Sequence, residues 1–204
     1  MIKRIHFKKF PDNNYPFNVL PLRNTDELQF GKITIFVGSN GSGKSTLLKA
    51  IAYYNDSINV SENEMDSIHF KEVKRLSSVM QVIYDYKTRT GFFFSGEEFI
   101  TYINNLKTMK ENLKKDIEEI KVEYKDKNEY ALKLALGPLK SSLSALKDKY
   151  GGHLEQKSHG EGFLTFFKSR MHQKGLYILD EPETPLSAVN QYQLVVMITD
   201  LVRE

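Results

Sequence analysis

The sequence contains no cysteine, and no apolar run in it approaches the length of a membrane-spanning helix. The absence of cysteine excludes disulfides, thiolate zinc sites and cysteine nucleophiles, and it leaves the redox compartment open. Every apolar run is shorter than the ~20 residues that a bilayer span needs. Residues 1–10 alternate apolar and polar side chains instead of carrying the continuous apolar core of a secretory signal. We therefore expect a soluble, cytoplasmic protein without membrane insertion.

Neither sign of charge dominates the sequence, which has 29 Lys and Arg against 26 Asp and Glu. This mildly basic balance permits contact with nucleic acid or an anionic membrane but argues for neither. With 204 residues, of which 40% are hydrophobic and 27% charged, the composition excludes a disorder-dominated protein. The chain is long enough for one α/β domain with a real core.

The most informative stretch is the run Gly-Ser-Asn-Gly-Ser-Gly-Lys-Ser-Thr at 38–46, which fits the G-x-x-x-x-G-K-[ST] phosphate loop at every fixed position. The β-branched run 32–37 predicts a buried strand before the loop, and 47–52 predicts a helix after it. The alternative is a glycine-rich turn that only joins these two elements. It is disfavoured because the glycines, the Lys-Ser-Thr ending and both flanking elements agree.

The chemistry of a phosphate loop explains each of these residue types. Glycines let successive backbone N–H groups surround a phosphate at the helix N-terminus. Lys44 would reach the β- and γ-phosphates as a catalytic group, and Ser45 would offer its hydroxyl to Mg²⁺. We expect the nucleotide to be bound by Ser39, Asn40, Gly41, Ser42, Gly43, Lys44, Ser45 and Thr46.

A second apolar run, Leu176–Leu179, ends in the two adjacent carboxylates Asp180 and Glu181. We predict a buried strand that delivers both acids at its C-terminal edge, where open α/β sheets bind ligands. The pattern fits a Walker B element, in which Asp180 holds Mg²⁺ beside Ser45 and Glu181 orients or deprotonates the attacking water. The alternative of two surface acids at a strand end weakens once the phosphate loop is accepted.

Two stripes of apolar residues, at positions 99–124 and 132–150, flank a charged turn near 125–128. Their near-heptad spacing predicts an antiparallel helical hairpin or coiled-coil arm over 99–150. The arm would be inserted between the segments 1–98 and 151–204 of the main domain, and Gly137-Pro138 would kink or break its second helix. Such stripes are usually packing seams, and the interleaved Lys and Glu are more typical of a solvated face than of a DNA grip.

The remaining pattern is one of alternating strands and helices, so we predict an α/β P-loop NTPase fold. Further strands are expected at 2–10, 78–84 and 91–94, a polar loop at 54–67, and helices at 163–171 and 186–202. The apolar face of the last helix would hold Leu194, Val195, Ile198, Leu201 and Val202. Tyr15, Phe17 and Arg23 are weaker candidates for nucleotide contact, because packing alone would explain each of them.

These motifs, in this order, resemble those of the ABC-type ATPases, and more closely the small SMC-like or RecF-like ATPases grouped as an AAA family. The motifs that carry the resemblance lie at 15–17, 37–48, 91–94, 158–161 and 179–183. It covers nearly the whole chain outside the hairpin. It implies a mixed sheet with an inserted helical hairpin, and ATP binding and hydrolysis with Mg²⁺. Roles in DNA maintenance or defence are expectations at the level of the family.

The resemblance also assigns the stretch 158–161 to the ABC signature. Ser158 and Gly160 would then bind the ATP held by a partner's phosphate loop, and the active form would be an ATP-sandwiched homodimer. The pattern alone predicts a capping box, with Ser158 three residues before Glu161. The two interpretations are compatible, because a helix N-terminus can face a phosphate across an interface. Glu97 stands near the place of the Q-loop glutamine that senses Mg²⁺, although the change to Glu weakens that assignment.

Three departures from the family pattern qualify the expected activity. The signature reads Lys-Ser-His-Gly-Glu instead of LSGGQ, which argues against an ordinary transporter subunit, and Ser187 replaces a common D-loop aspartate. All five histidines precede Asp180, so the strand and switch histidine expected after the Walker B helix are missing. We expect a truncated product, a strand supplied from elsewhere, or weak turnover.

Two other functions stay open from the sequence. One is the nucleotide-binding subunit of an ABC transporter, and the other is a nucleotide-gated interaction module with little turnover. The partner could be a second copy of the chain, nucleic acid or another protein.

Overall fold

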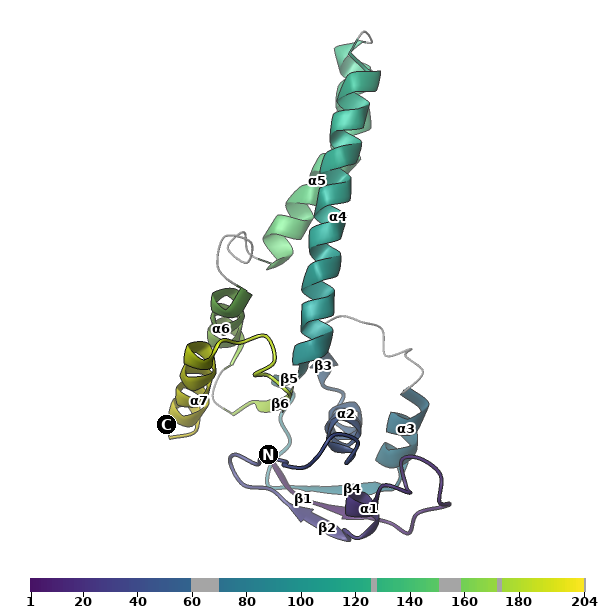
Figure 1. Ribbon diagram of the computed structural model, residues 1–204, viewed down its shortest axis with the longest axis vertical. Coiled ribbons are helices and arrows are strands. Elements are labelled where there is room, and N and C mark those ends of the chain that lie inside the picture. Colours follow the sequence, from purple (N-terminus) through teal and green to yellow (C-terminus); the bar gives the residue numbers. More distant parts are fainter. Residues whose placement is uncertain (60–69, 126–127, 151–158, 172–173, 204) are drawn as a thin grey trace.

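The computed structural model describes residues 1–59, 70–125, 128–150, 159–171 and 174–203. The predicted loop 54–67 and the start of the signature stretch therefore lie largely outside the described residues. Figure 1 shows a body of strands and short helices from which two long helices project. The elements are β1 (Ile2–Phe7), α1 (Leu20–Arg23), β2 (Glu27–Gln29), α2 (Lys44–Tyr54), β3 (Ile58–Asn59), α3 (Phe70–Ser78), β4 (Met80–Tyr84), β5 (Gly91–Ser95), α4 (Gly96–Glu123), α5 (Glu129–Tyr150), α6 (His159–Arg170), β6 (Leu176–Asp180) and α7 (Ala188–Arg203).

The described strands form two sheets of three strands each. The first is antiparallel, with the order β2-β1-β4, and the second is parallel, with the order β3-β5-β6. In the parallel sheet Ser95 at the end of β5 is in register with Asp180 at the end of β6. The prediction of one mixed sheet was wrong in this respect, because the parallel and antiparallel pairs belong to separate sheets. The α/β character and the strands at 2–7, 80–84, 91–95 and 176–180 were predicted correctly.

The largest error of prediction concerns the run 32–37, which is not a strand. Its β-branched side chains point outward, so that Ile35 is 78% exposed and Val37 is 92% exposed. Phe36 is the exception, because it packs against Phe30 and the neighbouring core. A strand forms only where a neighbouring edge accepts its backbone groups, and no described strand pairs with this segment. The residues therefore have β-propensity without a partner.

Two hydrophobic cores hold the body together. The first packs α2 and α3 on the antiparallel sheet, with Ile5, Ala50 and Leu76 fully buried. The second is mainly aromatic and joins β5 to α4, α6 and α7. At its centre, the Phe94 ring contacts the rings of Phe163 and Phe167 with centroids 4.9 and 5.0 Å apart. These edge-on aromatic contacts fix the ends of the parallel strands, and with them the position of Asp180.

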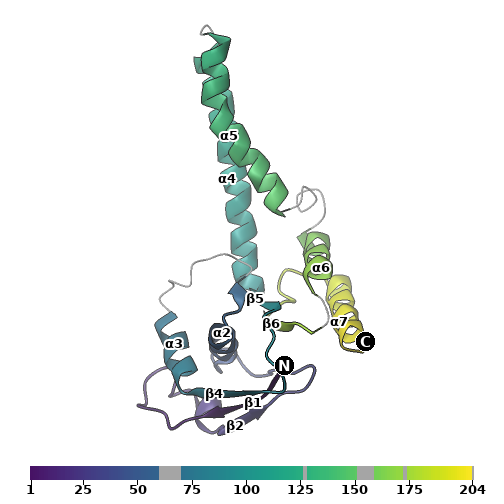
Figure 2. The ribbon, with the colours of Figure 1, turned by 180° about the vertical axis from the view of Figure 1, so that it is seen from behind.

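The two long helices α4 and α5 lie side by side over much of their length (Figures 1 and 2). The apolar stripes form their seam, in which Ile117 and Leu136 are buried. Pro138 lies inside α5 without ending it, so the helix is not broken there. Among the described helices, none is both long and apolar enough to cross a lipid bilayer.

Two helical details differ from the sequence-based expectation. Helix α3 was not predicted, although the structure buries its Val73 and Leu76 against α2. In α7 the predicted face was partly wrong: Leu194 is buried, but Val195 is 60% exposed. Sequence periodicity identifies the existence of an apolar stripe more reliably than its exact centre, because the packing partner selects which edge of the stripe is covered.

The start of α4 gives a test of this packing. A Cβ on Gly96 would lie 2.2 Å from the backbone carbonyl oxygen of Glu181, whereas a Cβ on Gly137 in α5 would meet open space. We expect Gly96→Ala to lower the free energy of unfolding by about 1–3 kcal/mol through overpacking. Gly137→Ala is the matched control and should raise it by about 0.5–1 kcal/mol. Urea unfolding measures both, and a Gly96→Ala variant as stable as the parent would contradict the contact.

Candidate active site

The phosphate loop reverses direction through two glycines in the left-handed region of backbone space. Gly41 has φ of 78° and Gly43 has φ of 85°, conformations that other residues adopt at a cost. Gly43 is the N-cap of α2, and a Cβ there would also lie 3.1 Å from Val19. The amide of Ser42 donates to the carbonyl of Ser39 across the loop. The loop therefore brings backbone groups to the positive end of an 11-residue helix.

Lys44 folds back over the loop that precedes it. Its ammonium nitrogen donates to the carbonyl oxygens of Gly38 and Ser39, at 2.7 and 3.0 Å. These bonds place the positive charge above the loop instead of in bulk solvent. An ammonium group has three protons to donate, so the two bonds leave one for a phosphate oxygen. Asn40 in the same loop is exposed.

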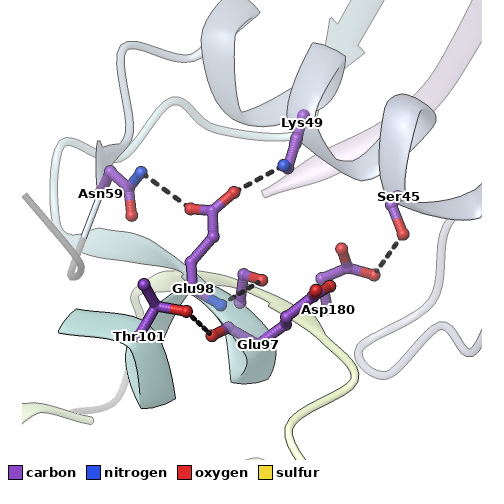
Figure 3. Close-up of polar contacts among 8 residues, drawn as sticks. Ser45, Lys49, Asn59, Glu97, Glu98, Thr101 and Asp180 are labelled. Atoms are coloured by element: carbon purple, nitrogen blue, oxygen red, sulfur yellow. Dashed lines mark hydrogen bonds and ion pairs between the residues drawn. The ribbon is translucent and has the colours of Figure 1, made fainter. Parts of the chain in front are cut away.

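The phosphate-loop helix and the β6 strand meet through one hydrogen bond. Ser45 Oγ, in the first turn of α2, donates to Asp180 Oδ1 at 3.1 Å. The two residues are 135 positions apart in the sequence. The contact brings the hydroxyl and the first carboxylate of the predicted pair to a single point, as Figure 3 shows.

The environment of Asp180 favours its neutral form. The side chain is buried, and the loss of hydration raises the pKa of this carboxyl above its usual value of 3.8. The hydrogen bond from Ser45 and the positive charge of Lys49 oppose this effect, while the charges of Glu181 and Glu98 add to it. A cation placed beside Asp180 would stabilise the ionised form, because an opposite charge nearby lowers a carboxyl pKa.

Glu181 follows Asp180 directly, but it has a different environment. Its φ of 45° is left-handed, which is uncommon for a residue with a side chain. Its side chain is exposed, and its carbonyl accepts a hydrogen bond from the amide of Thr184 at 3.1 Å. The sharp turn after β6 thus separates a buried acid from an exposed one. Strained residues of this kind are held by their surroundings and are frequent at functional sites.

The first turn of α4 contributes a different glutamate from the one that the sequence suggested. Glu98 Oε1 lies 2.6 Å from Lys49 Nζ, and Glu98 Oε2 accepts from Asn59 Nδ2 at 3.4 Å (Figure 3). Glu97 is exposed, and its backbone carbonyl accepts from Thr101 Oγ1. No described contact joins Glu97 to Ser45 or Asp180, so its predicted part in a metal site has no direct geometric support. Lys49 was not among the predicted site residues, although it stands four residues after Ser45 and therefore on the same side of α2.

The three weaker candidates near the N-terminus divide between the site and the core. The Tyr15 hydroxyl makes a hydrogen bond with Thr46 Oγ1, so this half-exposed aromatic ring lies beside the phosphate-loop helix. Phe17 is a core residue, only 1% exposed. Arg23 donates to Asn13 and makes no described contact with the loop.

Arg75 on α3 anchors the loop that carries Tyr15, and the sequence analysis did not identify it. It donates to the Tyr15 carbonyl and pairs with Asp12 at 2.6 Å. Its guanidinium also lies over the Phe17 ring, 4.9 Å from the centroid. Arg75 thus contacts Asp12, Tyr15 and Phe17 of this segment.

The predicted signature residues are only partly described. Ser158 lies outside the described residues, whereas Gly160 is in the first turn of α6, which begins at His159. Helix α6 packs into the aromatic core through the side chains of Phe163 and Phe167. No described contact joins its N-terminus to the phosphate loop of the same chain.

A divalent metal has a small set of possible ligands here. The described residues contain no group of three or more His, Cys, Asp or Glu side chains arranged to hold a metal ion. Ser45 and Asp180 supply one hydroxyl and one carboxylate at a single point. This donor set fits Mg²⁺, which usually takes one or two protein oxygens and completes its shell with water and substrate phosphates.

Comparison with known proteins identifies a family. Residues 25–184 match the family model described as "ABC transporter", a range that includes both the phosphate loop and the Asp180–Glu181 pair. Searches of curated proteins and of solved structures find no match.

The raised pKa of Asp180 predicts that burial of its carboxyl lowers the stability of the folded protein more strongly as the pH rises. A raised folded-state pKa means that stability is lost as the pH rises through that pKa. In the absence of nucleotide and metal, Asp180→Asn should therefore unfold at higher urea concentration than the parent at pH 7. The difference should shrink as the pH falls toward 3.8.

The matched control for this experiment is Glu183→Gln, which removes one negative charge from an exposed nearby side chain. An advantage of Asp180→Asn that is equal at all pH values would show that charge burial is not its cause.

Proposed function

Because the chain belongs to the ABC transporter family, we propose that it binds ATP at residues 38–46 and hydrolyses it with Mg²⁺ at the junction of α2 and β6. The observation that carries the proposal is the Ser45–Asp180 hydrogen bond. It joins the end of a phosphate loop to a carboxylate at a strand edge, which is the arrangement that phosphoryl transfer needs. The family assignment supports ATP binding and hydrolysis in general.

Binding of the triphosphate would fall to the loop and to Lys44. The amides of 39–46 and the helix N-terminus offer partial positive charge to phosphate oxygens. Lys44 adds a full charge whose position is set by the carbonyls of Gly38 and Ser39. The Tyr15 hydroxyl makes a hydrogen bond with Thr46 Oγ1 in the first turn of this helix, and we assign the ring a supporting role on that side.

Hydrolysis needs a metal and a positioned water in addition to the loop. Ser45 and Asp180 would hold Mg²⁺, which when bound neutralises charge on the phosphates. Glu181, exposed beside Asp180, would accept a proton from the attacking water or orient it. The left-handed turn at Glu181 turns this carboxylate away from the buried position of its neighbour. The buried Asp180 is thus suited to holding the metal, and the exposed Glu181 is suited to activating the water.

We further propose that the active form is an ATP-dependent homodimer. The support is the analogy of 158–161 with the ABC signature, in which Ser158 and Gly160 act on the partner's nucleotide. A helix N-terminus at His159 suits an anion, since its first amides lack partners within the helix.

The helical arm favours an SMC-like ATPase over a simple nucleotide-binding module. Helices α4 and α5 have 28 and 22 residues, and they project from the body between β5 and α6 (Figure 1). A transporter subunit is the second candidate, and the family description favours it. Stable copurification with a membrane protein would decide for the transporter. ATPase activity stimulated by DNA would decide for a role in DNA maintenance.

Lys44→Ala tests the nucleotide site. It removes the charge that would face the phosphates, so the Kd for ATP should rise at least about tenfold, equivalent to about 1.4 kcal/mol. Lys8→Ala removes one positive charge from an exposed position and should leave the Kd unchanged. Isothermal titration calorimetry with Mg-ATP provides the measurement. Equal affinity of the parent and Lys44→Ala would remove the phosphate-loop assignment.

Glu181→Gln tests hydrolysis and dimerisation together. Loss of a general base should reduce phosphate release by about 10²–10⁴-fold while ATP binding persists. Unhydrolysed ATP should then trap a dimer, which size-exclusion chromatography with light scattering detects. A Glu181→Gln variant that stays monomeric at saturating Mg-ATP would contradict the sandwich model.

A further inference from the structure

The Lys49–Glu98 ion pair completes a ring of contacts that joins α2, the first turn of α4 and the end of β6. This ring passes through Asp180 and Glu181, the two acidic residues of the site. Lys49 stands on α2, four residues after Ser45, and Glu98 stands in the first turn of α4. The ammonium nitrogen and the carboxylate oxygen are 2.6 Å apart, and the side chains are 30% and 25% exposed. Figure 3 shows this pair and the Ser45–Asp180 bond extending from the same helix.

The second part of the ring runs from Glu98 to Glu181 through the backbone. Ser95 caps α4 by accepting from the Glu98 amide, which ties Glu98 to the end of β5. Between them, Gly96 lies so close to Glu181 that a Cβ would be 2.2 Å from the Glu181 carbonyl oxygen. The first turn of α4 therefore packs directly against the backbone of Glu181, whose carboxylate is exposed.

The ring is completed by Asp180, which precedes Glu181 and accepts the hydrogen bond from Ser45. Two links thus connect α2 to the end of β6. One is direct, through Ser45 and Asp180, and the other passes through Lys49, Glu98 and Gly96. A single contact leaves a side chain free to rotate about it, whereas two contacts on one helix define an orientation. The strained φ of 45° at Glu181 is a conformation that such surroundings have to maintain.

We propose that Lys49 and Glu98 are positioning residues that hold Glu181 at a defined place relative to the phosphate loop. This inference rests on the proposed ATPase function, and it assigns the pair to the hydrolytic step instead of to nucleotide binding. The pair lies on the side of α2 that faces β6 and α4, whereas Lys44 faces the loop carbonyls. Small displacements of a reacting group matter, because about 1 Å of misplacement can reduce a rate about 100-fold.

The kinetic test compares Lys49→Met and Glu98→Gln with the double charge swap Lys49→Glu with Glu98→Lys. Each single variant should lower kcat about tenfold or more while the Kd for ATP stays within about twofold, because the position of Glu181 changes and the contacts of Lys44 with the phosphate loop are kept. The charge swap should recover at least half of the lost rate, which a general loss of packing would not do. Lys121→Met is the matched control, since it breaks a 2.6 Å ion pair with Glu118 on the exposed surface of the arm.

A second readout does not depend on turnover. Hydrogen exchange without nucleotide should show faster exchange in Lys49→Met at 96–99 and at the Thr184 amide, which donates to Glu181. Exchange in β1 and β4 should not change, and Lys121→Met should match the parent throughout.

These readouts separate the inference from the function on which it rests. If the parent protein neither binds nor hydrolyses ATP, the proposed function fails, and exchange at Thr184 still decides whether the ring exists. Unchanged exchange at Thr184 in Lys49→Met would overturn the ring. An unchanged kcat in both single variants of an active enzyme would overturn the positioning role, as would parallel loss of kcat and ATP affinity.

Discussion

The hydrogen bond between Ser45 and Asp180 is the contact on which the rest of the site depends. It joins a helix that follows a glycine loop to a strand that ends in carboxylates, across 135 residues of sequence. The phosphate loop, Lys44 and Glu181 each lie within a few residues of one of its two ends. The bond can hold only because each end is independently fixed, by the first core around α2 and by the aromatic core beside β6.

Burial gives the two adjacent acids opposite properties. Asp180 is buried at the end of β6 against α2, so loss of hydration raises its pKa and a nearby cation would stabilise its ionised form. Glu181 lies beyond the left-handed turn and is exposed to solvent. The proposed metal-binding role of the first and the proposed proton-accepting role of the second both rest on this short turn. The close approach of Gly96 to Glu181 connects this turn to the root of the arm.

The arm and the site share their first residues, which gives the long helices a place in the proposed chemistry. Helix α4 begins one residue after the end of β5, and its first turn contains Gly96, Glu97 and Glu98. The ion pair of Glu98 with Lys49 fastens this turn to α2. Any change in the relative position of α2 and β6 must therefore be accommodated at the base of the arm or by loss of that pair.

Local patterns in the sequence determined the loop at 38–46, the helix after it, the acids after β6 and the helical stripes of the arm. Each of these signals depends on neighbouring residues alone, through periodicity, glycine conformation or motif spacing. The tertiary structure decided what depends on a distant partner. Residues 32–37 have the composition of a buried strand, yet they are unpaired with the described strands, because β-structure requires a neighbouring edge. Likewise only the folded chain shows that Glu98 rather than Glu97 meets Lys49, since the two glutamates are adjacent and equivalent in sequence.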